Sequence, residues 1–114
     1  MDKNKDLQEY RAGVLKALSD PVRLEIVEFL KGGERCVCEI IPMLDRSQST
    51  TSKNLDILYR TSILDRRVEG KRTLYRIKNP RIFSLLKEVD NLALDQLSSL
   101  SKTAKMLKES LKGK

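Results

Sequence analysis

Residues 46–59 constrain the fold more than any other stretch, because their side chains divide between two faces of one helix. At about 100° per residue, one arc is wholly polar and the other becomes apolar only in its later turns. The polar arc comprises Gln48, Ser49, Ser52, Lys53, Asp56 and Arg60, and the opposite arc comprises Thr50, Thr51, Asn54, Leu55, Ile57 and Leu58. We therefore predict a helix anchored through its C-terminal half, with short polar side chains in its first two turns.

A helix start of this kind suits insertion into the major groove of double-stranded DNA. Short side chains let the backbone approach the bases, and the amide of Gln48 can pair with an adenine edge. Hydroxyl groups and the helix N-terminus suit phosphate oxygens. The alternative is an ordinary solvated helix start, since Ser and Thr are common N-cap residues. The residues predicted to contact bases or nearby phosphates are Gln48, Ser49, Thr50, Ser52, Lys53 and Arg60.

Three helical segments precede this stretch. Apolar residues at helical spacing predict a first helix over about 5–18. Asp20 is the expected N-cap of a second helix that begins at Pro21, with Val22, Ile26, Phe29 and Leu30 as its buried face. A third helix at about 37–44 should turn Ile40, Ile41 and Leu44 toward the core, and with the following helix it predicts a helix-turn-helix over about 37–61.

A β-hairpin wing is predicted next, over about 64–77. Strands at 64–68 and 72–77 flank a short Gly-bearing turn, and Arg66, Arg67, Lys71 and Arg72 crowd its tip. Residues 46–76 carry eight basic side chains against three acidic ones. Charge can simply keep an edge hairpin from aggregating. Directly after a helix-turn-helix, however, these four cations predict a wing that positions the duplex through its phosphates.

The last helix, predicted over about 81–111, carries an apolar stripe too long for this chain to cover. Spacings of three and four residues continue for about 30 residues, which is close to 45 Å of helix. Pairing with a second copy, together with the first helix, would bury the stripe. We therefore expect residues 1–114 to form one mainly α-helical winged helix-turn-helix domain, with helical dimerisation elements at both ends.

Composition excludes several functional classes. The chain has no His, which removes Ser–His and Cys–His nucleophile pairs and imidazole metal ligands. It has no phosphate-binding loop either, so an enzyme is not expected. No apolar run approaches the roughly 20 residues of a membrane span, and a cytoplasmic protein is expected. The remaining rival is a protein-interaction module that keeps the fold but has lost DNA binding.

Four motifs, in order, carry a family resemblance. They are LKALSDPVRLEIVEFL at 15–30, RCVCEI at 35–40, SQSTTSKNLDIL at 47–58 and EGKRTLYRI at 69–77. Together they resemble the ArsR/SmtB family of winged-helix repressors. The resemblance implies a homodimer whose recognition helices occupy successive major grooves of an imperfect palindromic operator, and an inducer that weakens DNA binding. Two departures are Ser52-Lys53-Asn54, where the family usually has Ser-Arg-His, and Ser62 before the wing.

The segment containing Cys36 and Cys38 resembles the family's Cys-Val-Cys-Asp-Leu-Cys box, an arsenite-sensing site. This implies a thiol-bound inducer, As(III), Sb(III) or another soft metal ion, with no resident cofactor. Ile41 stands at the third cysteine position, so water, hydroxide or an added thiol would complete the site. The family's second metal site is not expected, because Asp90 and Asp95 have no His beside them.

Binding at both sulfurs would distort the helix start and act on the recognition helix through the apolar residues of the third helix. Alternatives for the cysteine pair are a thiol redox switch or simple packing. A disulfide within one helix at this spacing is expected to be strained, because the two Cβ directions diverge.

Overall fold

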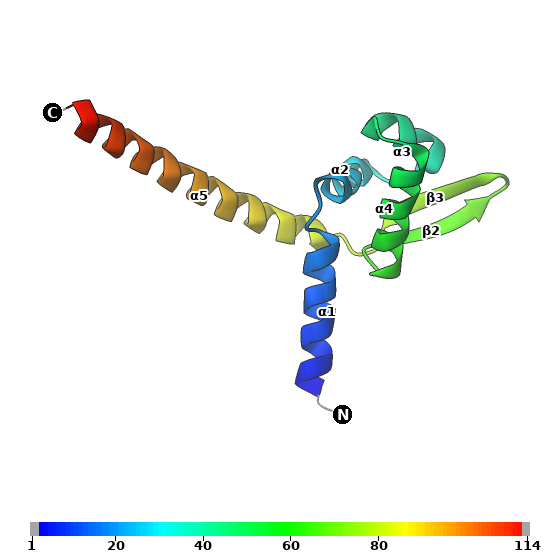
Figure 1. Cartoon of the computed structure of the whole chain (residues 1–114). Coiled ribbons are helices and arrows are strands. Elements are labelled where there is room, and N and C mark those ends of the chain that lie inside the picture. The colour runs from blue at the N-terminus through cyan, green and yellow to red at the C-terminus, as the bar shows by residue number, and fades with distance from the viewer. Residues whose placement is uncertain (1–2, 113–114) are drawn as a thin grey trace. The chain divides into compact units, whose positions relative to one another are not determined.

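The computed structural model describes residues 3–112, which form two compact units that divide after Pro80 (Figure 1). The first unit contains α1 (Lys3–Ala17), α2 (Pro21–Phe29), the 3-10 turn η1 (Leu30–Gly32), β1 (Arg35–Cys36), α3 (Val37–Leu44), α4 (Gln48–Arg60), β2 (Leu64–Glu69) and β3 (Arg72–Ile77). The second unit is α5 (Arg81–Lys112). The predicted mainly helical chain with one β-hairpin is confirmed.

The start of α2 shows how local sequence sets an element boundary. Asp20 has an extended backbone, and its carboxylate accepts hydrogen bonds from the backbone N–H groups of Val22, at 2.8 Å, and Arg23, at 3.3 Å. Pro21 follows at the first helical position, where its missing N–H costs no hydrogen bond. The predicted N-cap is confirmed.

The core of the first unit lies where α2, α3 and α4 meet the sheet. Its fully buried side chains include Ile26, Val27, Leu30, Ile40, Leu55, Leu58 and Leu64. Val22, Phe29 and Ile41, which were expected to be buried, are only half-buried, whereas Val27 was not foreseen. The eight-residue α3 is too short to be stable alone and is held through buried Ile40 and Leu44.

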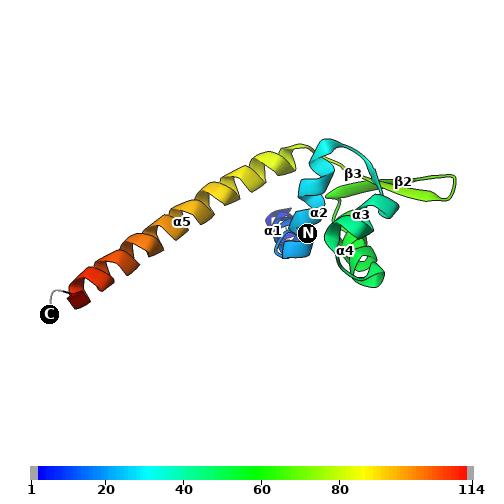
Figure 2. The ribbon, with the colours of Figure 1, turned by 90° about the horizontal axis from the view of Figure 1, so that it is seen from above.

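The sheet has three strands in the order β1-β3-β2, all antiparallel. The hairpin β2–β3 turns through Gly70 and Lys71, and Gly70 has the positive φ of 62° that a type II′ turn requires at its first position. In Figure 2, α3 and α4 lie on the same side of this hairpin, and α3 contacts β3 while α4 contacts β2.

Strand β1 was not predicted, since Arg35 and Cys36 precede the helix that was expected over about 37–44. Both residues are extended and pair with β3, Arg35 opposite Tyr75 and Cys36 opposite Leu74. A strand of two residues is too short to show the alternation of apolar and polar residues by which strands are recognised in a sequence.

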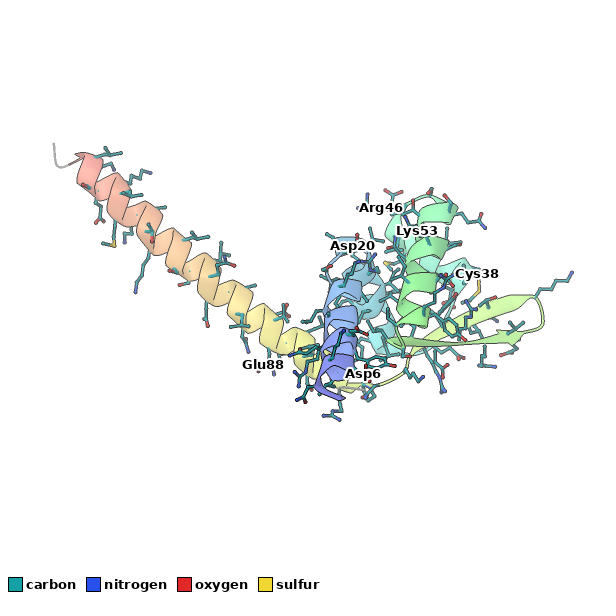
Figure 3. All side chains as sticks on the ribbon, turned by 60° about the horizontal axis from the view of Figure 1, so that its bottom comes forward. Asp6, Asp20, Cys38, Arg46, Lys53 and Glu88 are labelled. Carbon is teal, nitrogen blue, oxygen red and sulfur yellow. A yellow bond between two sulfur atoms is a disulfide. The ribbon has the colours of Figure 1, made fainter. Side chains whose placement is uncertain are left out.

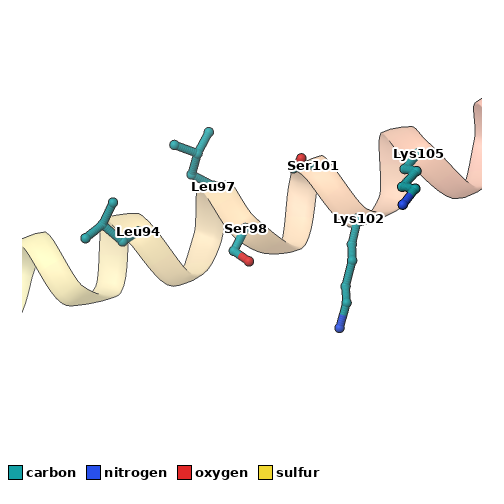
Figure 4. Close-up of a pocket in the computed structure, with 6 residues that line it drawn as sticks. All are labelled: Leu94, Leu97, Ser98, Ser101, Lys102 and Lys105. Carbon is teal, nitrogen blue, oxygen red and sulfur yellow. The ribbon is translucent and has the colours of Figure 1, made fainter.

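Helix α5 is 32 residues long and has no buried residue. Figure 4 shows part of its surface, where Leu94 and Leu97 are followed by Ser98, Ser101, Lys102 and Lys105. Among residues 3–112, no helix is both long enough and apolar enough to cross a membrane.

Candidate nucleic-acid interface and cysteine pair

Helix α4 begins at Gln48, two residues later than predicted. Asp45 adopts a left-handed conformation that ends α3. Ser47 is extended, and its Oγ accepts a hydrogen bond of 3.1 Å from the N–H of Thr50. This side-chain cap satisfies an N–H that has no partner within the helix, so α4 starts after Ser47.

The two arcs predicted for α4 are largely present. Thr51, Asn54, Leu55 and Leu58 are buried and Ile57 is half-buried. Gln48, Ser49, Ser52, Lys53 and Arg60 are exposed, and Lys53 is labelled in Figure 3. Thr50 is the exception to the arc assignment, because it is exposed and bonded to the Ser47 hydroxyl at 2.9 Å. The first two turns of α4 therefore present small polar groups on a helix held from behind.

A half-buried arginine, not anticipated from the sequence, joins α4 to two other helices. The guanidinium of Arg23 donates to Asn54 Oδ1, at 2.9 Å, and to the backbone carbonyls of Ala17, at 2.5 Å, and Lys16, at 3.2 Å. Asn54 in turn donates to the carbonyl of Thr50 at 2.9 Å. Arg23 thus ties the end of α1 to the recognition helix. Nothing in the local sequence marks it, since its partners lie up to 31 positions away.

Two of the four predicted wing cations are held by carboxylates of the same chain. Arg67 makes a bidentate pair with Glu34, at 2.7 and 2.9 Å, and a second ion pair with Glu69 at 2.9 Å. The hydrogen bond between Arg67 and Glu34 raises the pKa of Arg67 and lowers that of the Glu34 carboxyl. Arg66 lies 3.8 Å from the centre of the Tyr59 ring and 3.6 Å from an oxygen of Asp56.

The cations nearest the hairpin turn behave differently. Lys71 and Arg72 are exposed and form no ion pair with any residue in the described part of the chain. Arg60, the cation at the end of α4, pairs with Asp56 at 2.8 Å. Of the four predicted wing cations, Lys71 and Arg72 are therefore the most available to a phosphate.

Cys36 and Cys38 are joined by a disulfide. The expected strain concerned a disulfide with both cysteines inside one helix. Cys36 instead has an extended backbone (φ −73°, ψ 148°) and is the N-cap of α3, so the Cβ directions of a regular helix do not apply. Its sulfur accepts from the N–H of Cys38 at 3.0 Å, and its N–H donates to Glu39 at 3.1 Å.

The two sulfurs differ in their environments. Cys36 is 2% exposed, whereas Cys38 is solvent-exposed. Within residues 3–112, no cluster of three or more His, Cys, Asp or Glu side chains is arranged to hold a metal ion.

Comparison with known proteins identifies the family. Residues 20–64 match the model for bacterial regulatory proteins of the arsR family. Over 85 residues, covering 74% of this chain and 96% of the relative, the chain is 40% identical to an uncharacterised HTH-type transcriptional regulator of Methanocaldococcus jannaschii. The chain belongs to the ArsR family. As a member, it is a DNA-binding transcriptional regulator and not an enzyme.

A solved structure of a possible ArsR-family transcriptional regulator has the same fold. The homodimeric winged helix-turn-helix DNA-binding domain from Mycobacterium bovis superimposes with a TM-score of 0.75 at 33% identity, covering 84% of this chain and 92% of that one. Among regulators of known response, the chain is 41% identical to the cadmium resistance regulatory protein CadC of Listeria innocua, over 66% of this chain and 64% of that protein. The predicted winged helix-turn-helix, with α3 and α4 as its paired helices and β2–β3 as its wing, is confirmed.

Proposed function

We propose that this ArsR-family chain acts in the cytoplasm as a homodimeric repressor of a palindromic operator, and that a thiol-binding inducer releases it. The observation that supports DNA reading most directly is the division of α4. Its first turns present exposed Gln48, Ser49, Ser52 and Lys53, while Leu55 and Leu58 anchor the helix in the core. Small polar side chains on a rigid helix suit contact with base edges.

We assign the proposed DNA contacts according to which side chains are exposed and free of ion pairs within the chain. Gln48, Ser49, Thr50, Ser52 and Lys53 contact bases or the adjacent phosphates. On the wing, Lys71 and Arg72 meet phosphates directly, whereas Arg66 and Arg67 must first exchange a carboxylate partner for a phosphate. Arg60 must likewise leave Asp56.

A salt titration of a duplex from the protein's own promoter tests DNA binding. Each phosphate neutralised by the protein contributes about −0.9 to the slope of log K against log salt, so specific binding should weaken steeply as salt rises. Absence of binding at low salt would contradict the proposal and would favour a protein-interaction module. A duplex of scrambled sequence is the control for non-specific binding.

The proposed dimer rests on the uncovered apolar stripe of α5. Val89, Leu100, Leu107 and Leu111 are between 44% and 76% exposed. The Mycobacterium bovis relative is a homodimer. A second copy, paired through α5 together with α1, would remove this apolar surface from water.

The proposed inducer is trivalent arsenic or antimony, or a soft ion such as Cd(II). The disulfide must first be reduced, for example by two glutathione molecules that are themselves oxidised to glutathione disulfide. The two thiols then replace two hydroxides of arsenous acid, forming two As–S bonds and releasing two waters, while the third position keeps its hydroxide or takes an added thiol. Soft ligands of this type favour such ions.

A DNA-release titration with arsenite tests the inducer. Reduced wild-type protein should release the duplex, and Cys36→Ser and Cys38→Ser should need much more arsenite. Serine is a good N-cap residue, so Cys36→Ser keeps the start of α3. Equal release by all three proteins would contradict metalloid sensing by this pair.

A further inference from the structure

The cysteine pair is built into the sheet that carries the wing. Cys36 ends β1, where it pairs with Leu74 of β3, and Cys38 follows in the first turn of α3. The pair therefore lies beside the hairpin as well as at the start of the helix behind α4. In Figure 3, Cys38 is on the side of the first unit that carries α4 and the hairpin.

One hollow brings the cysteines together with both parts of the proposed DNA-binding surface. Its lining includes Cys36 and Cys38, Ser52 of α4, and Lys71 and Arg72 of the wing. The hollow measures about 610 Å³. Since a water molecule occupies roughly 30 Å³, it has room for a phosphodiester group with its hydration shell.

The charge of this hollow suits the backbone of nucleic acid. Its charged lining residues are Arg66, Lys71 and Arg72, and no carboxylate lines it. Lys71 and Arg72 have no ion-pair partner within the described residues. A duplex that receives α4 in its major groove and meets the wing with its phosphates must pass over the space between them, which is where Cys38 is exposed.

We infer that Cys38 lies inside the surface that DNA covers, so that a ligand bound to its sulfur and the DNA exclude one another. This inference rests on the proposed DNA-binding function. It replaces the expected route, in which strain passes through Ile40 and Leu44 to the recognition helix, with direct competition for one surface. Once the disulfide is reduced, Cys36 and Cys38 would hold a metalloid at the hollow that a phosphate would occupy.

Protection from alkylation tests this inference without any inducer. In the Cys36→Ser protein, Cys38 is the sole thiol, and its reaction with iodoacetamide can be followed by mass spectrometry. With duplex at about twenty times its Kd, alkylation should slow about twentyfold, because only the unbound fraction reacts. Unchanged alkylation of protein that is fully bound to DNA would overturn the inference and leave the proposed function intact. Absence of DNA binding would instead remove both.

A matched reporter controls for general effects of DNA on thiol reactivity. Ser19 is exposed, at the end of α1, and its position is outside the hollow. In protein that carries Cys36→Ser, Cys38→Ser and Ser19→Cys, DNA should leave the alkylation rate unchanged. Equal protection of both reporters would show that the effect is not local to the hollow, and would count against the inference.

The dependence of DNA affinity on arsenite distinguishes exclusion from allostery. If the two ligands exclude one another, the apparent Kd for DNA rises in proportion to arsenite once the site is saturated, with no plateau. Coupling between separate sites saturates, commonly at about 5–150-fold. A plateau accompanied by a stable complex of protein, arsenic and DNA would overturn exclusion.

Discussion

Helices α4 and α5 are both amphipathic, yet the chain covers the apolar face of only one of them. In α4, Leu55 and Leu58 are at most 1% exposed, because α2 and the sheet pack against them. In α5, Leu97 and Leu100 are 63% and 60% exposed, and no residue of the helix is buried. Full burial of such a side chain is worth about 1.5–3 kcal/mol. The apolar face of α4 is thus covered within the chain, whereas that of α5 is covered only in the proposed dimer.

The largest effect should come from a charge on the stripe of α5. Leu100→Asp places a carboxylate where a second copy is proposed to pack, and should give a monomer. A monomer has one recognition helix instead of two, so operator binding should weaken by about 10²–10⁴-fold, because the second half-site no longer adds to the first. Sedimentation velocity and operator titration measure the two outcomes.

Leu94→Asp is the matched control for this change. Leu94 is 61% exposed, nearly the same as Leu100, but lies about 120° around the helix at 100° per residue. The Leu94→Asp protein should remain a dimer and should bind DNA with normal affinity. Wild-type protein that sediments as a monomer at micromolar concentration would remove the basis of the comparison.

The matching change in α4 should act on folding instead of assembly. Leu58→Ala removes a side chain that is fully buried, and should lower the free energy of unfolding by about 2–5 kcal/mol. Denaturant unfolding measures this loss, with Leu85→Ala, a surface leucine of α5, as the comparison. Since the contacts of Leu58 lie within one chain, the loss should persist in the Leu100→Asp monomer. A loss that vanished in the monomer would show that α4 also depends on the dimer.

The same contrast explains which features the sequence could predict. Helices and the hairpin follow from periodic patterns and turn residues, such as the Asp20-Pro21 start of α2 and Gly70 at the hairpin turn. Strand β1 has two residues and no detectable period. The disulfide depends on an extended Cys36, which in turn depends on pairing with β3.

The sequence identifies the candidate site residues by their charge and polarity. It does not show which of them are free to contact DNA and which are already paired within the chain. Arg67 and Lys71 are alike in sequence terms, since both are cations near the tip of the wing. Glu34, which forms an ion pair with Arg67, lies 33 positions away, and such pairings arise only from the tertiary fold. Arg67 resembles α4 in finding its partners within the chain. Lys71 resembles the apolar stripe of α5, which has no such partner among the described residues.

Arg23 should be the polar counterpart of Leu58 in holding α4. Arg23→Ala removes the guanidinium donor from Asn54 Oδ1 and from the carbonyl of Ala17, while the carbonyl of Lys16 keeps its bonds from Ser19; the loss should cost about 1–3 kcal/mol. Arg23→Lys cannot reach three acceptors with one ammonium group and should recover only part of the loss. Arg11→Ala, at an exposed position of α1, is the control.

A double-mutant cycle separates positioning of α4 from general destabilisation. Arg23→Ala combined with Asn54→Ala should show a coupling of about 0.5–3 kcal/mol in unfolding. Operator affinity should also fall in Arg23→Ala under conditions where it remains folded. Normal affinity of the folded variant would restrict Arg23 to a stabilising role.

The smallest effects should separate the free cations of the wing from the paired ones. Lys71→Ala should reduce the magnitude of the salt slope of DNA binding by about 1, as expected for loss of one phosphate contact. Arg67→Ala should reduce it less, because Glu34 and Glu69 already neutralise that guanidinium. The Glu34 carboxyl, whose pKa is lowered by its hydrogen bond with Arg67, is ionised at neutral pH, so the pair is intact there. Glu34→Gln therefore provides the decisive variant: it leaves Arg67 with Glu69 alone and should steepen the salt slope. If Arg67→Ala and Lys71→Ala had equal effects, and Glu34→Gln none, ion pairing within the chain would not govern which wing cations reach DNA.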